Sequence, residues 1–224
     1  MKKIDVASWD RKSHYEWFSA FADPSVAFDV KMDITELLAW CKSRGVSSFA
    51  ALMYIVTESI NGEEAFRLRV LGEDVVLVDY ANVAYTIMVN EDTFVNCRAR
   101  LNRGFRAYCE DVEANRVKFS DSNYVQDEYN DVSVVNDIYC SCVPWLNFTS
   151  VRQPVPDHIP ESRSIPRACW GKYVKEGDRT YVTLNITASH ALVDGLNMSR
   201  VFSAIQAGFD DPQKFVDQRE VTPS

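Results

Sequence analysis

The chain has 224 residues, of which 24 are basic and 32 acidic, so its formal net charge is −8. The length and the lack of any linker-like stretch predict one domain over residues 1–224, large enough to bury a core without disulfides or metal ions. The acidic balance argues against nonspecific nucleic-acid binding. The longest apolar run, residues 49–56, is much shorter than the roughly 20 residues of a membrane helix, so no membrane contact is expected. The N-terminal lysines precede no apolar segment, which predicts a cytoplasmic protein without a signal peptide.

Apolar residues spaced three and four apart predict five helices along the chain. Asp33 and Ser48 are the expected N-caps of the second and third helices, and Gly45 is expected to end the second. The predicted helices cover residues 13–21, 33–45, 48–60 and 105–116, and a segment that follows Gly195.

Segments rich in Val, Ile, Thr and Tyr predict strands between these helices. A Pro-rich stretch, residues 150–165, is expected to form an irregular surface excursion. The order of elements lacks a regular βαβ alternation, so the predicted fold class is α+β, a two-layer arrangement with a mixed β-sheet flanked by helices. The predicted strands are residues 75–80, 83–89, 132–142, 143–148, 168–174 and 180–188.

The six cysteines form no C-x-x-C pair, and we expect them to be reduced and to pack as small apolar groups. The three histidines, His14, His158 and His190, have no ligand-like spacing to any cysteine. No metal site is therefore predicted.

One stretch, Ser189-His190-Ala191-Leu192-Val193-Asp194-Gly195, lies where a predicted strand ends and a helix begins. A histidine at such a junction can face a cleft, and its pKa near neutrality suits a general base. By spacing alone, this H-x-x-x-D-G pattern is a weak signal, and a surface histidine beside a capped helix is the favoured interpretation.

Three further motifs accompany it in a fixed order. The chain reads W-D-R-K-S-H over residues 9–14, then P-W-L-N-F over 144–148 with Ser141 before it, then G-K-Y over 171–173 with E-G-D over 176–178. Together with the His190 motif, this ordered set resembles the chloramphenicol acetyltransferase family nearly from end to end.

The resemblance implies a CoA-dependent acyltransferase that forms a homotrimer with active sites between subunits. It implies acetyl transfer from acetyl-CoA, as co-substrate, to the hydroxyl of a small-molecule acceptor, with no metal. By the same resemblance, His190 is the general base and Ser141 stabilises the oxyanion. Asp194 and Arg11 correspond to a buried ion pair that holds the site in shape.

The resemblance also assigns substrate contacts. Phe18, Thr86 and Phe94 correspond to acceptor-pocket positions, and Cys169 stands where the family has a threonine that helps to hold a water. Lys172 and Tyr173 lie where family members approach CoA.

Two departures predict an acceptor pocket more polar than that of drug-acetylating relatives. Gln153 aligns near an apolar family position, and Glu128 aligns near another. Two alternatives therefore stay open: an O-acyltransferase with a different acceptor, and a catalytically silent trimeric binding protein. A dihydrolipoyl acyltransferase is disfavoured because Ala191, and not the arginine usual there, follows His190.

Overall fold

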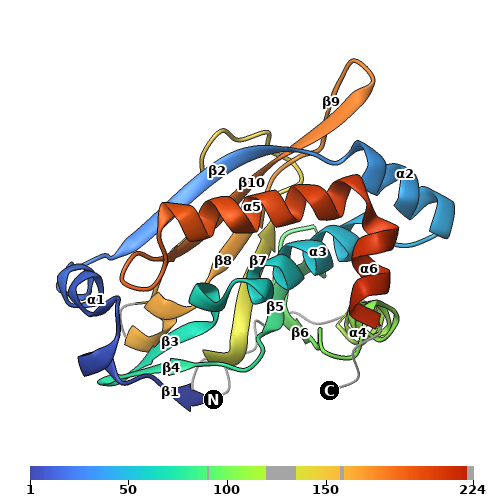
Figure 1. Cartoon of the computed structure of the whole chain (residues 1–224). Helices are drawn as coiled ribbons and strands as arrows, with labels where there is room; N and C mark the ends of the chain where they lie inside the picture. Colours follow the sequence, from blue (N-terminus) through green and yellow to red (C-terminus); the bar gives the residue numbers. More distant parts are fainter. Residues whose placement is uncertain (90, 120–134, 157–158, 221–224) are drawn as a thin grey trace.

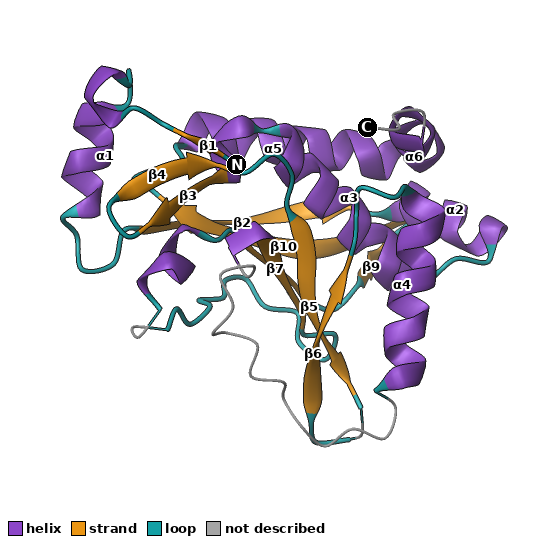
Figure 2. Cartoon of the chain, turned by 90° about the horizontal axis from the view of Figure 1, so that it is seen from below, coloured by secondary structure: helices purple, strands orange, loops and turns teal. Residues whose placement is uncertain are grey.

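A mixed β-sheet with helices gathered on one side forms the body of the protein, as the computed structural model shows (Figures 1 and 2). The structure describes residues 1–89, 91–119, 135–156 and 159–220. The helices are α1 Lys12–Ser19, α2 Thr35–Arg44, α3 Ser48–Gly62, α4 Phe105–Lys118, α5 Gly195–Asp210 and α6 Pro212–Glu220. The strands are β1 Lys2–Lys3, β2 Ser25–Asp33, β3 Leu68–Leu71, β4 Asp74–Leu77, β5 Asn82–Met88, β6 Phe94–Ala99, β7 Asp137–Cys142, β8 Arg167–Trp170, β9 Val174–Glu176 and β10 Arg179–Ser189.

The large sheet has the strand order β2-β10-β8-β7-β5-β6, and β9 pairs with β10. β7 runs parallel to both β5 and β8, whereas the other pairs are antiparallel. Strands β1, β4 and β3 form a separate small sheet. The predicted class, a mixed sheet flanked by helices, is therefore confirmed.

Helix α3 lies at the centre of the core because its sequence is apolar on nearly every side. Its residues from Ala50 to Asn61 are all buried, and it packs against α5. The cap of this helix is Ser47, whose hydroxyl accepts a hydrogen bond from the Ala50 amide, so the prediction of Ser48 as cap was one residue late. Gly45 ends α2 as predicted, with φ of 66° in the left-handed region.

The start of α2 also differs from the prediction. The helix begins at Thr35, with Ile34 as the flanking residue, and Asp33 accepts hydrogen bonds from both the amide and the hydroxyl of Thr35. Asp33 thus satisfies an amide at the helix start from one position further out.

The predicted strand over residues 143–148 is wrong. This segment is a turn and loop, because Pro144 lacks the N–H that a ladder needs. Gly171 explains the packing of this loop: a Cβ there would lie 2.7 Å from the Leu146 carbonyl oxygen and 3.0 Å from the Phe148 ring. The P-W-L-N-F and G-K-Y motifs are therefore packed against each other.

Other predicted strands are shorter than expected. Strand β7 begins only at Asp137, and the predicted residues 132–134 lie outside the described part of the chain. Residues 171–173 separate β8 from β9. Strands β1, β2, β3 and β6 and helix α6 were not predicted.

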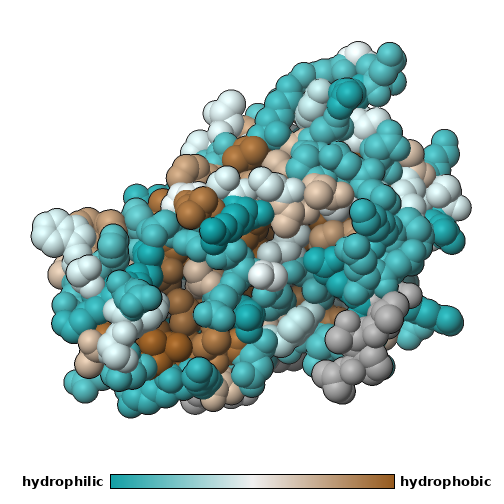
Figure 3. Space-filling model, in the orientation of Figure 1, coloured by the Kyte–Doolittle hydropathy of each residue, from teal (hydrophilic) through white to brown (hydrophobic). Residues whose placement is uncertain are grey.

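The helical face of the molecule is largely hydrophilic, with hydrophobic residues visible in a hollow over β3 and β4, near the start of α5 (Figure 3). No helix in the described part of the chain combines the length and apolar character that crossing a membrane requires.

Candidate active site

The His190 motif forms a tight loop between β10 and α5. The amides of Leu192 and Val193 both donate to the Ser189 carbonyl, and the His190 amide donates to the Pro24 carbonyl at 2.7 Å. The backbone of this segment, residues 189–194, is thus fixed from within and by the chain before β2. We call it the histidine loop.

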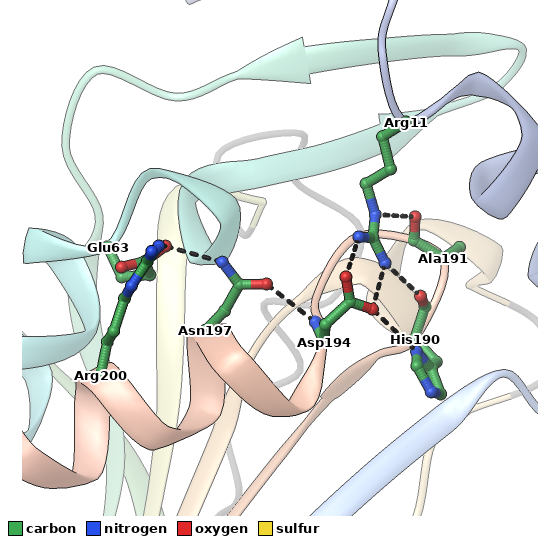
Figure 4. A network of polar contacts seen from close by, with 7 residues as sticks. All are labelled: Arg11, Glu63, His190, Ala191, Asp194, Asn197 and Arg200. Carbon is green, nitrogen blue, oxygen red and sulfur yellow. Dashed lines mark hydrogen bonds and ion pairs between the residues drawn. The ribbon is translucent and has the colours of Figure 1, made fainter.

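Arg11 fastens the histidine loop from the other end of the chain (Figure 4). Its Nε donates to the Ala191 carbonyl at 3.0 Å, and its Nη2 donates to the His190 carbonyl at 2.9 Å. The same guanidinium forms a two-pronged ion pair with Asp194, in which Nη2 and Oδ1 are 2.8 Å apart. The pair is less buried than expected, because the Asp194 side chain is 38% exposed.

Asp194 connects Arg11 to the imidazole of His190. The hydrogen bond from Arg11 lowers the pKa of the Asp194 carboxyl below its ordinary value, and the positive charge of Arg11 acts in the same direction. His190 Nδ1 lies 3.5 Å from Asp194 Oδ1. The ring therefore turns Nδ1 toward the carboxylate and Nε2 away from it (Figure 4).

Phe18 holds the other side of the imidazole. Its ring stacks on that of His190 with centroids 3.9 Å apart and planes 10° apart. The predicted pocket residue Phe18 thus belongs with His190, where it limits rotation of the ring.

Four further predicted site residues lie together on the face of the sheet opposite the helices: Ser141, Thr86, Phe94 and Cys169. Ser141 pairs in register with Cys169, Cys169 with Asn185, and Asn185 with Asp29. Their neighbours along the strands, Cys140, Ala168 and Ile186, point into the core, so alternation places these four on the other face. The resulting polar row crosses six strands: Asn96, Thr86, Ser141, Cys169, Asn185 and Asp29.

A cavity of about 380 Å³ opens over the polar row, and we call it the polar cavity. Ser141, Thr86, Phe94 and Cys169 line it, as does Gln153 from the segment after β7. The sequence prediction had placed all five residues at the reacting centre or in the acceptor pocket. Glu128, the other position expected to be polar, lies outside the described residues.

Gln153 is held in the polar cavity by a buried amide. Its Nε2 donates to Asn185 Oδ1 at 3.3 Å, and Asn185 is fully buried. Asn185 in turn donates to Asp29 Oδ1 at 3.0 Å and to the Val151 carbonyl at 3.3 Å. The amide of Gln153 is therefore built into the wall of the cavity.

Cys169 lies beside Ser141 and is nearly fully buried. Burial raises the pKa of its thiol to about 11, so the thiol stays protonated near neutral pH. A protonated thiol is a weak hydrogen-bond donor and a poor nucleophile.

Lys172 and Tyr173 lie at the end of the sheet away from His190. Lys172 is exposed, and its amide donates to the Leu146 carbonyl at 2.8 Å. Tyr173 packs against the core and shares a hydrogen bond with Ser48, and burial raises the pKa of its phenol to about 12.

Within one chain, Ser141 and His190 are too far apart to touch the same substrate atom. Cys169, level with Ser141, pairs with Asn185, and His190 follows five residues later along β10. That separation is about 16 Å along the strand and, with β8 between β7 and β10, about 10 Å across the sheet. His190 is accordingly absent from the lining of the polar cavity.

Sequence reasoning missed several residues that line the cavity or hold the site. Asn96 and Arg98 line the cavity, and the alternation of β6 could have revealed them had that strand been recognised. Tyr139 and Arg167 reach the cavity by the same alternation on β7 and β8. Among the described residues, no three His, Cys, Asp or Glu side chains group as metal ligands do.

Comparison with solved structures identifies the fold as that of acetyltransferases. A solved chloramphenicol acetyltransferase superposes with a TM-score of 0.82 at 21% identity, covering 92% of this chain and 98% of the other. A probable dihydrolipoamide acetyltransferase from Listeria monocytogenes superposes with a TM-score of 0.64 at 16% identity, covering 94% and 92%.

Sequence comparison then gives the family. The family model described as chloramphenicol acetyltransferase matches residues 1–206. A chloramphenicol acetyltransferase from Proteus mirabilis is 28% identical over 213 residues, covering 93% of this chain and 94% of the relative. One from Escherichia coli is 25% identical over 217 residues, covering 94% of each. The chain belongs to the chloramphenicol acetyltransferase family.

Proposed function

We propose that this protein transfers the acetyl group of acetyl-CoA to the hydroxyl of a small-molecule acceptor, with chloramphenicol as the first candidate. The observation that carries the proposal is the arrangement of His190. Its Nδ1 faces an Arg11-paired carboxylate, its ring stacks on Phe18, and Nε2 turns away from both Asp194 oxygens. A histidine held this way is prepared to act as a general base.

The chemistry follows from that geometry. Nε2 of His190 takes the proton of the acceptor hydroxyl as its oxygen attacks the thioester carbonyl carbon. The C–S bond then breaks, and the CoA thiolate recovers the proton from the imidazolium. Asp194 and Arg11 keep the ring in place, so they act through His190.

Ser141 is proposed to donate its hydroxyl hydrogen to the oxyanion that forms on the thioester carbonyl. A donor of this kind contributes about 3 kcal/mol to lowering the barrier. The adjacent thiol of Cys169, at the family threonine position, supplies a weaker hydrogen bond than a hydroxyl would. It therefore holds a water at the reacting centre less firmly.

Lys172 and Tyr173 are proposed to contact CoA. The exposed ammonium of Lys172 suits a phosphate group, whereas Tyr173, whose phenol already bonds Ser48, offers a ring edge and backbone. Acetyl-CoA is a substrate of the proposed reaction.

The assembly proposed is a homotrimer with each site between two subunits. The separation of Ser141 from His190 within one chain supports this, because a neighbour's histidine loop could bring Nε2 to the polar cavity. Large apolar side chains are exposed beside both halves: Trp17 and Leu196 near His190, and Phe94 and Met88 near the cavity. Such side chains become buried when subunits associate.

A second candidate keeps the reaction and changes the acceptor. Gln153, fixed by Asn185, and Asn96 place amides in the wall of the cavity. When an apolar drug binds, these amides lose their water without gaining a hydrogen-bond partner. An acceptor with several hydroxyls would form hydrogen bonds with them instead.

The test follows CoA thiol release from acetyl-CoA with chloramphenicol, comparing the unmodified protein with His190→Ala. General-base loss is expected to slow release by about 10²- to 10⁴-fold. Slow release by both proteins with the drug, and fast His190-dependent release with a polyhydroxyl acceptor, would favour the second candidate. Equal release from both proteins with every acceptor would overturn the proposed mechanism.

A further inference from the structure

The amide of Asn197 links the histidine loop to the core helix α3. Asp194 and Asn197 cap α5 reciprocally. The Asp194 carboxylate accepts a hydrogen bond from the backbone N–H of Asn197, and the side-chain Oδ1 of Asn197 accepts one from the backbone N–H of Asp194 at 2.9 Å. The usual partner at this position is Glu or Gln. The shorter Asn side chain directs its own Nδ2 onward, to Glu63 Oε1 at 2.8 Å.

Glu63 is well placed to fix that amide. It is the C-cap residue that directly follows α3, a helix buried along most of its length, and its side chain is only 19% exposed. Arg200 Nη1 lies 3.7 Å from the same Oε1 and offsets its charge. Asp194, Asn197 and Glu63 thus connect the site to the end of the core helix α3, and the exposed Arg200 lies beside Glu63 (Figure 4).

Asn197 and Arg11 bind Asp194 at different groups and from different sides. Arg11 binds the Asp194 carboxylate and the carbonyls of His190 and Ala191, whereas Asn197 binds the Asp194 backbone from the helix side. Because Asp194 is held at both its carboxylate and its backbone N–H, the carboxylate has little freedom to move relative to His190 Nδ1.

We infer that Asn197, oriented by Glu63, is a positioning residue that sets the placement of Asp194 against the His190 imidazole. It touches neither substrate nor the reacting nitrogen and acts through Asp194. The kinetic consequence rests on the proposed acetyl transfer. A misplacement of about 1 Å at a reacting group can cost about 10²-fold in rate, so a smaller shift of Asp194 is expected to lower kcat about tenfold.

A pair of substitutions tests this by exchanging donor and acceptor. In Asn197→Asp, a carboxylate oxygen replaces Nδ2 and meets the Glu63 carboxylate. An acidic residue in the first turn of α5 suits the helix dipole, so the variant is expected to fold. Adding Glu63→Gln restores a donor opposite an acceptor, with the direction of the bond reversed.

The expected kinetics in the assembled protein are specific. Asn197→Asp lowers kcat about tenfold with KM within about twofold, and the double variant recovers to within about threefold of the unmodified protein. Asn197→Ala, which removes both bonds, is the second variant and is expected to match Asn197→Asp. Ser203→Ala, at an exposed position on the same helix, is the control and should leave kcat unchanged. Unchanged kcat in both Asn197 variants, a rise in KM alone, or a double variant no more active than Asn197→Asp would overturn the inference.

A readout independent of turnover separates this inference from the proposed function. The ring ¹⁵N signals of His190, assigned by their loss in His190→Ala, report its tautomer and surroundings. They should shift in Asn197→Asp and return in the double variant. Unshifted His190 signals in Asn197→Asp would contradict the inference even in an active protein. Absence of thiol release from the unmodified protein with every acceptor would refute the proposed activity, and the ring signals would still decide the role of Asn197.

Discussion

The two halves of the site are built in different ways. The histidine loop, residues 189–194, is a short contiguous segment fixed by hydrogen bonds from Arg11 and within its own backbone. The polar cavity is assembled from single residues on β5, β6, β7 and β8 and from the segment near Gln153. Charge-assisted hydrogen bonds hold the histidine loop in place. In the polar cavity, the alternation of side chains along each strand decides which residues face the cavity.

This difference predicts how each half responds to change. A substitution in the histidine loop disturbs several bonds at once, because Arg11 alone makes four of them. A substitution in the polar cavity changes one wall and leaves the sheet in register. Substitutions in the histidine loop should therefore mainly lower the rate of acetyl transfer. Substitutions in the polar cavity should mainly change which acceptor is bound.

Ser141 is the exception in the cavity, since its proposed role lies in the chemistry. Ser141→Ala is expected to lower kcat about 10²- to 10³-fold with little change in KM, because an oxyanion donor acts mainly in the transition state. Steady-state thiol release measures this. A loss confined to KM would move Ser141 from catalysis to substrate binding.

Removing Arg11 should harm both activity and stability. Arg11→Ala leaves the Asp194 carboxylate without its ion pair and two loop carbonyls without their donor. We expect kcat to fall about 10²-fold as the loop loosens, and the free energy of unfolding to fall by about 1–3 kcal/mol. Urea unfolding and thiol release check the two effects. Lys12→Ala, which removes an exposed pair with Glu16, is the matched control and should change neither.

Gln153 should affect acceptor choice alone. Gln153→Leu removes a partly buried amide from the cavity wall. We expect KM for chloramphenicol to fall about five- to tenfold with kcat within about twofold, since the bound drug no longer desolvates a polar group. Initial rates over a range of drug concentrations test this. A raised KM would show that the amide binds the drug.

Acid should weaken the histidine loop through Asp194. The folded-state pKa of this carboxyl lies below its unfolded value, so its ion pair stabilises the protein fully above about pH 4. That contribution is lost as pH falls through the lowered pKa. Thermal unfolding of the unmodified protein and of Asp194→Asn should therefore differ at neutral pH and converge in acid. A constant difference at every pH would contradict this.

The motifs of the histidine half could be found because each is local in sequence: H-x-x-x-D-G and W-D-R-K-S-H each lie within one segment. The pairing of Arg11 with Asp194, 183 positions apart, was expected only from the family resemblance. Asn197 escaped because its partner Glu63 is 134 positions away and neither belongs to a motif.

The cavity half was predicted only in part. Strand β2 was missed although Val26, Phe28, Val30 and Met32 alternate, because Asp29 and Lys31 between them make the segment look polar. Its Asp29 completes the polar row, so the support behind Gln153 could not be foreseen. The segment 143–148 was predicted as a strand from its apolar content, although its proline excludes a ladder.

The proposed shared site requires one subunit to supply His190 and its neighbour to supply Ser141. Mixing two inactive variants, His190→Ala and Ser141→Ala, tests it most directly, after joint unfolding and refolding or co-expression. In a symmetric trimer with shared sites, about a quarter of the sites in an equal random mixture combine an intact His190 with an intact Ser141. We therefore expect the mixture to recover about a quarter of the activity per site. Activity no higher than that of the separate variants would contradict it.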